Sequence, residues 1–197
     1  SLWWNGSDFA GGSQWFDNTT GTNSWVYTGY ANKLVTHNNY TISVRAYDNA
    51  VPLPGNYETV LSSISFIYDV TQPTAAVSYP SAGQKLNLLT TLTGTAYDAF
   101  SVAGVSVTIR ELNGPYWTGS TFSALTETWF SATGLNSWTW TVPPLQDGKM
   151  YMVYVKARDA AGNVQDPPNY ISFTYDITDP TSRVITPVNS TFLQTIN

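Results

Sequence analysis

An internal repeat constrains the fold of this chain more than any other feature of its sequence. Residues 116–181 can be aligned with residues 3–74, and both copies carry aromatic side chains at matching places. Tyr116 aligns with Trp3 and Phe173 aligns with Phe66, so the offset is 113 residues at the Trp-rich beginning and 107 residues at the end. A repeat of about this length has the size of one small domain, so the sequence predicts tandem domains of one type.

The repeat also predicts where the units begin and end. We expect residues 72–178 to form one complete unit, residues 1–71 to be the C-terminal part of a preceding unit, and residues 179–197 to be the first strand or strands of a third. The opening of that third unit is indicated by Pro180, Thr181, Val184, Pro187 and Leu193, which match Pro73, Thr74, Val77, Pro80 and Leu86. On this interpretation the chain is a piece of a longer array, and an upstream segment or a neighbouring chain completes the core of the first unit.

Apolar and polar residues alternate with a period of two through the complete unit, which is the pattern of half-buried strands. The alternating segments lie at 91–97, 105–110, 137–142, 151–158 and 171–175. Tyr40 and Tyr151 each open a strand after a turn, in the position of the tyrosine corner of immunoglobulin-type sandwiches. The sequence therefore predicts an all-β chain of tandem immunoglobulin-like antiparallel β-sandwiches, with one complete and two partial units. We expect Trp138 and Trp140, and in the first unit Trp25 and Tyr27, to face the cores.

The composition excludes several classes of function. Eight basic residues and a net charge of -5 argue against binding to a phosphate backbone, so we expect no nucleic-acid partner. No apolar run approaches the roughly 18 residues that a membrane span requires. The chain has no Cys, which rules out disulfides and Cys-based metal sites. Aromatic residues make up 15% of the chain and charged residues 11%, so ring and aliphatic packing must hold the sheets together.

Three segments resemble bacterial Ig-like repeat domains. These are the run from Gly94 to Ile109, the run from Tyr151 to Asn163, which ends in Asp-Ala-Ala-Gly-Asn, and the linker 176–181, which reads Asp-Ile-Thr-Asp-Pro-Thr. The chain departs from that family in its Trp-rich middle, and in residues 48–52, which read Asp-Asn-Ala-Val-Pro. The resemblance implies stacked domains in long secreted or cell-surface proteins that act as adhesins, stalks or filaments.

Four residues with side-chain oxygens belong to segments that gather at one end of an Ig-like sandwich, namely Asp69, Asp98, Asp159 and Asn163. Oxygen ligands from several segments can hold one Ca²⁺ between consecutive domains and stiffen the joint. The resemblance implies the same, because related arrays use calcium at such junctions. The alternative is that each Asp only hydrogen-bonds its own turn. In the first unit Asp48 aligns with Asp159, but a longer loop displaces the equivalent of Asn163.

A second set of candidates is aromatic and precedes a Gly turn in both copies: Trp3, Trp4, Tyr116 and Trp117. Exposed rings at these positions could stack on a sugar or on a neighbouring subunit. Because the pair recurs in both units, a repeated structural role is the other interpretation, and recurrence alone does not separate the two.

The sequence gives no support for catalysis. His37 is the only His, lies in a turn and aligns near Gly148, and no Gly-rich phosphate loop follows a strand. We therefore expect no catalytic residues and a non-enzymatic structural module, a spacer, stalk or filament-forming unit of an extracellular or cell-surface protein. Its expected partners are adjacent repeats and identical neighbouring chains, and Ca²⁺ is the only expected cofactor. The alternative is a carbohydrate-binding adhesin module, or an accessory module of a polysaccharide-degrading enzyme, that binds a glycan through exposed Trp residues.

Overall fold

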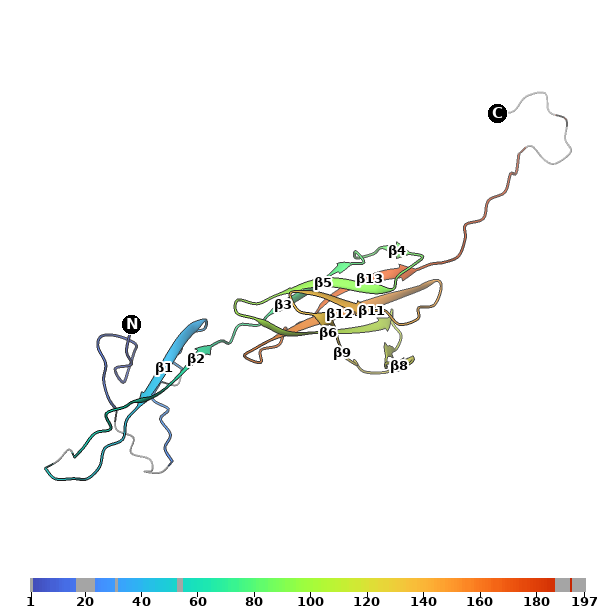
Figure 1. The fold of residues 1–197 in the computed structure, drawn as a ribbon. Coiled ribbons are helices and arrows are strands. Elements are labelled where there is room, and N and C mark those ends of the chain that lie inside the picture. The colour runs from blue at the N-terminus through green and yellow to red at the C-terminus, as the bar shows by residue number, and fades with distance from the viewer. Residues whose placement is uncertain (1, 17–23, 31, 53–54, 187–191, 193–197) are drawn as a thin grey trace.

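The computed structural model describes residues 2–16, 24–30, 32–52, 55–186 and 192. Within these residues the secondary structure is entirely β, which confirms the expected all-β class (Figure 1). The strands are β1 (Asn38–Val44), β2 (Ser62–Tyr68), β3 (Thr74–Tyr79), β4 (Lys85–Leu86), β5 (Thr91–Tyr97), β6 (Val102–Glu111), β7 (Tyr116–Trp117), β8 (Phe122–Ala124), β9 (Phe130–Ser131), β10 (Thr133–Gly134), β11 (Ser137–Thr141), β12 (Lys149–Asp159) and β13 (Asn169–Tyr175).

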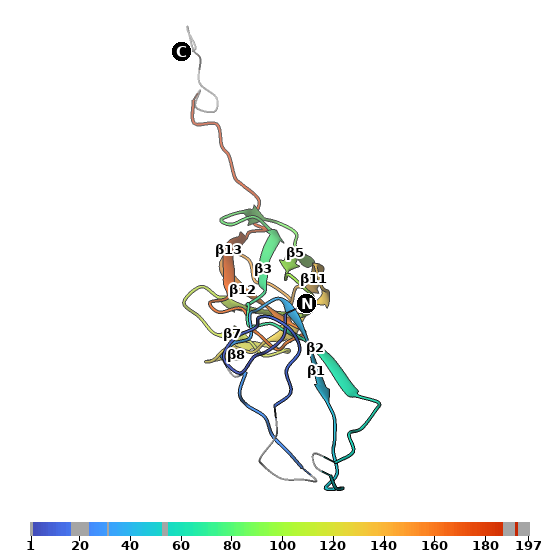
Figure 2. The ribbon, with the colours of Figure 1, turned by 90° about the vertical axis from the view of Figure 1, so that its left-hand side faces the viewer.

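Strands β3 to β13 build a sandwich of two sheets. One sheet has the order β10-β11-β5-β3, and the other has the order β4-β13-β12-β6-β7-β8, with β9 paired to β6. Figure 2 shows β13 and β12 on one side and β5 and β11 on the other. All five segments that alternate in the sequence form strands, namely β5, β6, β11, β12 and β13. Most of the pairings are antiparallel, whereas β4 runs parallel to β13.

The alternation directs one face of each sheet into a common core. Because successive side chains of a strand point to opposite faces, every second residue of β12 from Tyr151 to Asp159 is buried. In β6, Val105, Val107 and Ile109 are buried in the same way, and Thr108 between them is buried as well. Gly94 lies opposite Trp138 in the pairing of β5 with β11, and a Cβ at this position would collide with the indole and with the carbonyl of Ala76. The largest side chains in the core are Leu92, Ile109, Trp138, Tyr151 and Phe173.

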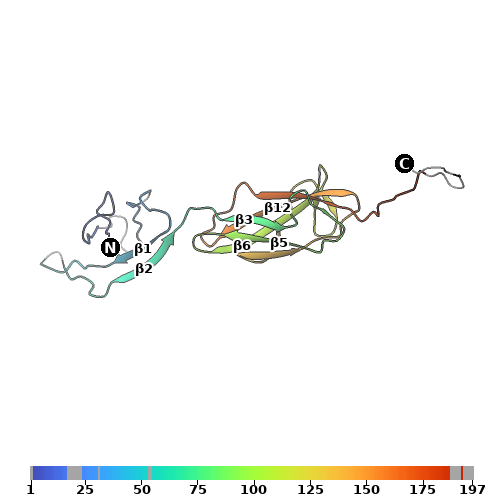
Figure 3. The same ribbon diagram turned by 90° about the horizontal axis from the view of Figure 1, so that it is seen from above.

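The preceding part of the chain contains one hairpin-like pair, in which β1 and β2 run antiparallel with Asn38 opposite Tyr68 and Val44 opposite Ser62. This pair lies beyond one end of the sandwich, and residues 176–186 leave from the opposite end (Figures 1 and 3). Of residues 179–197, for which the sequence predicts a third unit, 187–191 and 193–197 lie outside the described residues. Residues 179–186 form no strand.

Two tyrosines hold equivalent corners in the two parts of the chain. The hydroxyl of Tyr151 accepts a hydrogen bond from the backbone N–H of Gln146 at 2.8 Å. The hydroxyl of Tyr40 accepts one from the backbone N–H of Val35 at 2.7 Å, also five residues upstream. The tyrosine-corner prediction is therefore confirmed at both positions.

Each tyrosine also belongs to a row of four contacting rings, which we call a ring ladder. In the sandwich the ring centroids are 5.1, 5.4 and 5.7 Å apart along Trp117, Phe122, Tyr151 and Phe173. The aligned ladder has spacings of 5.4, 5.2 and 5.8 Å along Trp4, Phe9, Tyr40 and Phe66. Repeated aromatic packing of this kind supplies much of the cohesion of a chain that has no Cys.

The prediction for the strand that carries Trp25 is wrong. Trp138 is buried in β11, as expected, and Trp140 packs against the core. Trp25 is 46% exposed, because residues 24–28 form no strand and no second sheet covers them within the described part of the chain. Tyr27 is half-buried beside Phe16, with the two ring centroids 5.8 Å apart. Among the described residues, no helix has the length and apolarity needed to cross a bilayer.

Candidate metal centre between the strand pair and the sandwich

Three carboxylates converge where the strand pair meets the sandwich. Asp69 directly follows β2, Asp98 directly follows β5, and Asp159 is the last residue of β12. One oxygen from each lies within 4.8 Å of the other two. The structure therefore brings together the three aspartates that the sequence singled out, from segments up to 90 residues apart.

Asp159 is the most enclosed of the three, at 1% exposure. Its Oδ1 accepts hydrogen bonds from the backbone N–H groups of Gly162 and Asn163, both at 2.7 Å, and its Oδ2 accepts one from Asn163 Nδ2 at 2.7 Å. Burial raises the pKa of Asp159, but these hydrogen bonds outweigh burial and hold the pKa below its usual value. The carboxylate is therefore ionised at neutral pH.

Asp98 contributes an oxygen without a protein partner. Its Oδ1 accepts hydrogen bonds from the backbone N–H groups of Phe100 at 2.9 Å and Ser101 at 3.1 Å, which is a turn of the expected kind. Its Oδ2 is buried and has no hydrogen-bond partner among the described residues. A buried oxygen of a carboxylate is costly to leave unpaired, and a cation beside it would remove that cost.

Asp69 connects the cluster to the strand pair, and its side chain is only 5% exposed. Its Oδ1 accepts hydrogen bonds from the backbone N–H of Thr71 at 2.9 Å and from Thr36 Oγ1 at 3.2 Å. His37 Nε2 lies 3.4 Å from the same oxygen. The His37 ring also contacts the edge of Phe100, with centroids 5.4 Å apart, so this turn histidine touches both sides of the junction.

Asn163 lies in the cluster but presents a donor to it. Its Nδ2 bonds to Asp159 Oδ2 at 2.7 Å and to the main-chain oxygen of Asp69 at 3.1 Å. In this orientation Asn163 ties two of the aspartates together, and its amide would have to rotate for the carbonyl oxygen to face a cation. The carbonyl and amide groups of the side chain occupy similar space, so either role is sterically possible.

The donor set suits a hard divalent cation. All three charged groups are carboxylates, which repel one another at this separation unless a positive charge lies between them. Ca²⁺ binds six to eight oxygens, including carboxylates, carbonyls and waters. Asp69, Asp98 and Asp159 would supply the charged ligands, and main-chain oxygens and waters would complete the shell. The unpaired Oδ2 of Asp98 is the observation that favours this fit over three self-contained turns.

The first part of the chain contains a matching Asp–Asn clasp that the sequence alignment missed. Asp48 Oδ1 accepts hydrogen bonds from the backbone N–H groups of Ala50 and Asn56, and Asp48 Oδ2 accepts one from Asn56 Nδ2 at 2.9 Å. The backbone N–H of Asp48 donates to the main-chain oxygen of Asn56, and the backbone N–H of Asp159 likewise donates to the main-chain oxygen of Asn163. The longer loop therefore displaces the Asn in sequence and returns it to the same place in space.

A short signal in the sequence could have found Asn56. The dipeptide Gly55-Asn56 matches Gly162-Asn163, and both glycines have positive φ, +83° and +101°. Only glycine adopts such a φ readily, so a Gly-Asn pair after an Asp marks the end of the clasp whatever the loop length. No acidic cluster forms around Asp48 in the described part of the chain.

The four aromatic candidates divide into two inward and two outward rings. Trp4 and Trp117 are half-buried in the ring ladders, and Trp4 Nε1 also donates to the hydroxyl of Tyr27 at 2.9 Å. Trp3, one residue before Trp4, is 43% exposed. Tyr116, one residue before Trp117, lies at the surface groove described below. The structure therefore does not bring the four rings together at one place.

No family model matches the chain, and no curated protein does. Two solved structures show a limited likeness. CopC from Methylosinus trichosporium OB3b is 19% identical over 56% of this chain and 99% of its own, with a TM-score of 0.38. The twitchin kinase region from C. elegans is 17% identical over 47% of this chain, with a TM-score of 0.23, and the chain spans 17% of it. The assignment as a β-sandwich rests on the sheets themselves.

Proposed function

We propose that this chain is a non-enzymatic spacer, a structural repeat module of an extracellular or cell-surface protein whose joints are stiffened by Ca²⁺. The observation that carries the proposal is the junction itself, where Asp69 from the linker meets Asp98 and Asp159 from the sandwich. A cation held by both sides would resist bending between them, and its removal would leave three carboxylates in mutual repulsion.

The linker supports the same role. Only residues 69–73 separate β2 from β3, and Pro73 within them is buried and fixes its own φ. Asn163 and His37 add contacts across the junction, to the Asp69 main chain and to Phe100. A short linker with contacts from both sides transmits orientation from one unit to the next.

An extracellular setting is compatible with a calcium joint of this kind. Sites with few protein carboxylates in extracellular modules bind Ca²⁺ with dissociation constants on the order of 10⁻⁴–10⁻³ M. The partners that fit this role are adjacent repeats of the same protein and identical neighbouring chains packed side by side.

The test compares the chain in about 5 mM Ca²⁺ with the chain in chelator. Calorimetry measures thermal unfolding, and small-angle X-ray scattering measures the chain dimensions. This Ca²⁺ concentration is about fivefold to fiftyfold above the expected dissociation constant. We expect a higher melting temperature and a narrower distribution of dimensions with Ca²⁺. Asp98→Asn should remove both effects, whereas Asp48→Asn, which alters the other clasp, should retain them. Identical curves with Ca²⁺ and chelator for the unaltered chain would refute the calcium-stiffened spacer.

Glycan binding is a second candidate function, in an adhesin or in an accessory module of a polysaccharide-degrading enzyme. It is favoured by the outward rings, Trp3 in the first part of the chain and Tyr116 in the sandwich. A spacer and a glycan-binding surface are compatible, because the calcium junction and the outward rings use different residues.

A further inference from the structure

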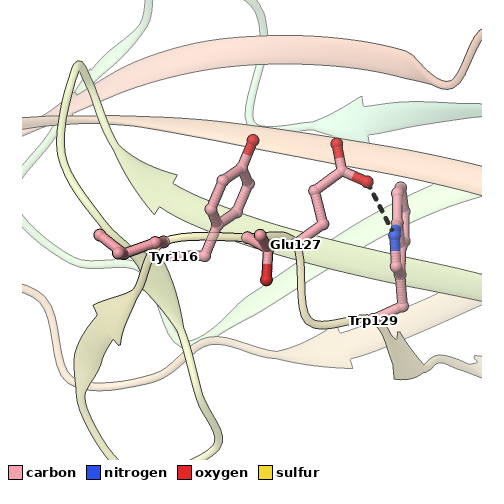
Figure 4. Close-up of a pocket in the computed structure, with 5 residues that line it drawn as sticks. Tyr116, Glu127 and Trp129 are labelled. Carbon is pink, nitrogen blue, oxygen red and sulfur yellow. Dashed lines mark hydrogen bonds between the residues drawn. The ribbon is translucent and has the colours of Figure 1, made fainter.

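A surface groove next to β7 combines two aromatic rings with a carboxylate. It has a volume of about 420 Å³ and is lined by Tyr116, Leu125, Thr126, Glu127 and Trp129 (Figure 4). The groove is shallow and open to solvent, so a ligand would rest on it with one face exposed. None of these residues belongs to the candidate metal centre.

Tyr116 and Trp117 differ in what their rings contact. Both are half-buried, but Trp117 packs against the core in its ring ladder, whereas Tyr116 lines the groove. The Arg110 guanidinium, on the paired strand β6, lies 5.1 Å from the centroid of the Tyr116 ring, and Arg110 Nη1 donates to the Tyr116 hydroxyl at 3.4 Å. The ring is therefore held at the surface by a neighbour on the sheet.

Trp129 is held in a similar way on the other side of the groove. The Lys156 ammonium lies 3.9 Å from the centroid of its ring, and its Nε1 donates to Glu127 Oε2 at 3.0 Å. Figure 4 shows this bond, and it shows the second carboxylate oxygen of Glu127 turned away from the indole nitrogen. The bond engages one oxygen of Glu127, and the residue as a whole is exposed.

Leu125 adds an aliphatic side chain to the lining of the groove. It is 94% exposed, so its surface is available for contact. Thr126 and Glu127 follow it immediately and supply a hydroxyl and a carboxylate. Rings and an aliphatic side chain thus adjoin polar groups within one groove.

We infer that this groove binds a sugar residue of a glycan, with the sugar's apolar face against Tyr116 or Trp129 and its hydroxyl groups bonded to Glu127. A sugar offers both surfaces at once, C–H groups on one face and hydroxyls at its rim. A cationic ligand fits less well, because each ring already has a cation beside it, Arg110 or Lys156. The inference rests on the second candidate function and gives it a site.

The first part of the chain provides a natural comparison. Trp15 aligns with Trp129, and the Arg45 guanidinium lies 4.1 Å from its ring centroid, as Lys156 lies over Trp129. The segment before Trp15 reads Ala-Gly-Gly-Ser-Gln, where the segment before Trp129 reads Ser-Ala-Leu-Thr-Glu-Thr. The Trp–cation pair is repeated, but Leu125 and Glu127 have no counterparts, so Trp15→Ala is a matched control.

The experiment titrates the chain with cellohexaose, xylohexaose, mannohexaose and chitohexaose. Calorimetry and saturation-transfer NMR measure the binding of each. We expect at least one of them to bind, and we expect Trp129→Ala and Glu127→Gln each to weaken that binding at least tenfold. Trp15→Ala should leave it within twofold. Backbone amide spectra of the variants establish that each is folded.

The outcomes distinguish failure of the groove as the binding site from failure of glycan binding by the chain as a whole. If an oligosaccharide binds and both groove variants bind it as tightly as the unaltered chain, the groove is not the site, although glycan binding stands. If none of the four binds, the groove inference is overturned together with the glycan-binding candidate. The calcium-stiffened spacer is decided by other measurements and is unaffected by either result.

Discussion

Asn163 donates a hydrogen bond from its side-chain Nδ2 to the main-chain oxygen of Asp69, at 3.1 Å and across 94 residues of sequence. The same Nδ2 bonds to Asp159, so one amide group both closes the last loop of the sandwich and attaches that loop to the linker. Asn56 closes the corresponding loop on Asp48. The two asparagines therefore share a local role, and Asn163 has a second role at the junction.

Asn163→Ala should cost more stability than Asn56→Ala. Each variant leaves an aspartate without its side-chain donor, a loss of about 1–3 kcal/mol where the carboxylate is buried, as for Asp159, and less where it is exposed, as for Asp48. Urea denaturation would measure the difference. Amide hydrogen exchange at residues 69–72 should accelerate in Asn163→Ala only, and equal exchange in the two variants would contradict a junction role for Asn163.

Tyr151→Phe should lower the free energy of unfolding by about 0.5–1.5 kcal/mol, the usual net worth of one hydrogen bond. The variant keeps the ring in its ladder and removes only the acceptor for the Gln146 N–H at 2.8 Å. Tyr170→Phe is the control, because that residue is exposed on the outer face of β13. Denaturant titrations should give a lower free energy of unfolding for Tyr151→Phe than for Tyr170→Phe. If Tyr151→Phe is as stable as the unaltered chain, the hydrogen bond at the corner adds no stability.

Gly94→Ala should destabilise the sandwich by about 1–3 kcal/mol or prevent folding, because the new methyl group would overlap the Trp138 indole and the Ala76 carbonyl. Gly104→Ala is a matched control in β6 of the other sheet, since no atom lies within 4 Å of a Cβ added there. Thermal melts compare the two. A Gly94→Ala variant as stable as Gly104→Ala would show that the Trp138 indole and strand β3 can shift to admit the methyl group.

Asp147 should anchor the second linker in a pH-dependent way. Its Oδ2 accepts a hydrogen bond from Thr178 Oγ1 at 2.6 Å, and its Oδ1 accepts one from the Ile177 N–H at 2.7 Å. The Thr178 bond is the larger cause that lowers the pKa of Asp147 below its usual value, followed by the Ile177 bond. A carboxylate with a lowered pKa stabilises the folded arrangement above the unfolded pKa, near pH 4, and loses that contribution as the pH falls through the folded pKa.

NMR titration of the Asp147 carboxyl would test this prediction. The midpoint should lie below that of an unstructured aspartate, and Thr178→Val should move it upward. The amide shift of Ile177 should follow the same midpoint, since its partner is the titrating group. If the midpoint is unchanged in Thr178→Val, the Thr178 hydrogen bond does not lower the pKa of Asp147.

The features that depend on strand periodicity could be predicted from the sequence. Alternation around Val107 and Val153 identified β6 and β12, and the position of Tyr151 after a turn identified its corner. The meeting of Asp69, Asp98 and Asp159 followed from the sandwich topology, because strand ends that are distant in sequence share one end of the fold.

Features in irregular segments could not be predicted from strand periodicity. Asn56 was missed because loop length, and not spacing, separates it from Asp48, and Trp25 was misplaced because its segment has no sheet opposite it in the described structure. The pairing of Glu127 with Trp129 has no periodic signal at all, since the segment between β8 and β9 is not a strand. Alternation could not tell whether Tyr116 or Trp117 packs against the core, because the pairing of β7 with β8 is irregular between these two residues.

The parallel pairing of β4 with β13 bears on how the chain would carry force. Thr174 lies opposite Lys85 and Tyr175 opposite Leu86, and the chain enters and leaves the sandwich at opposite ends (Figure 1). Tension along the chain would draw β13 one way and the segment leading into β4 the other. The backbone bonds between them, including Thr174 N–H to Gln84 O at 2.9 Å and Asp176 N–H to Leu86 O at 2.9 Å, would then be sheared together instead of opening one after another. In the proposed spacer, this short patch would therefore resist extension at the point where tension leaves the sandwich.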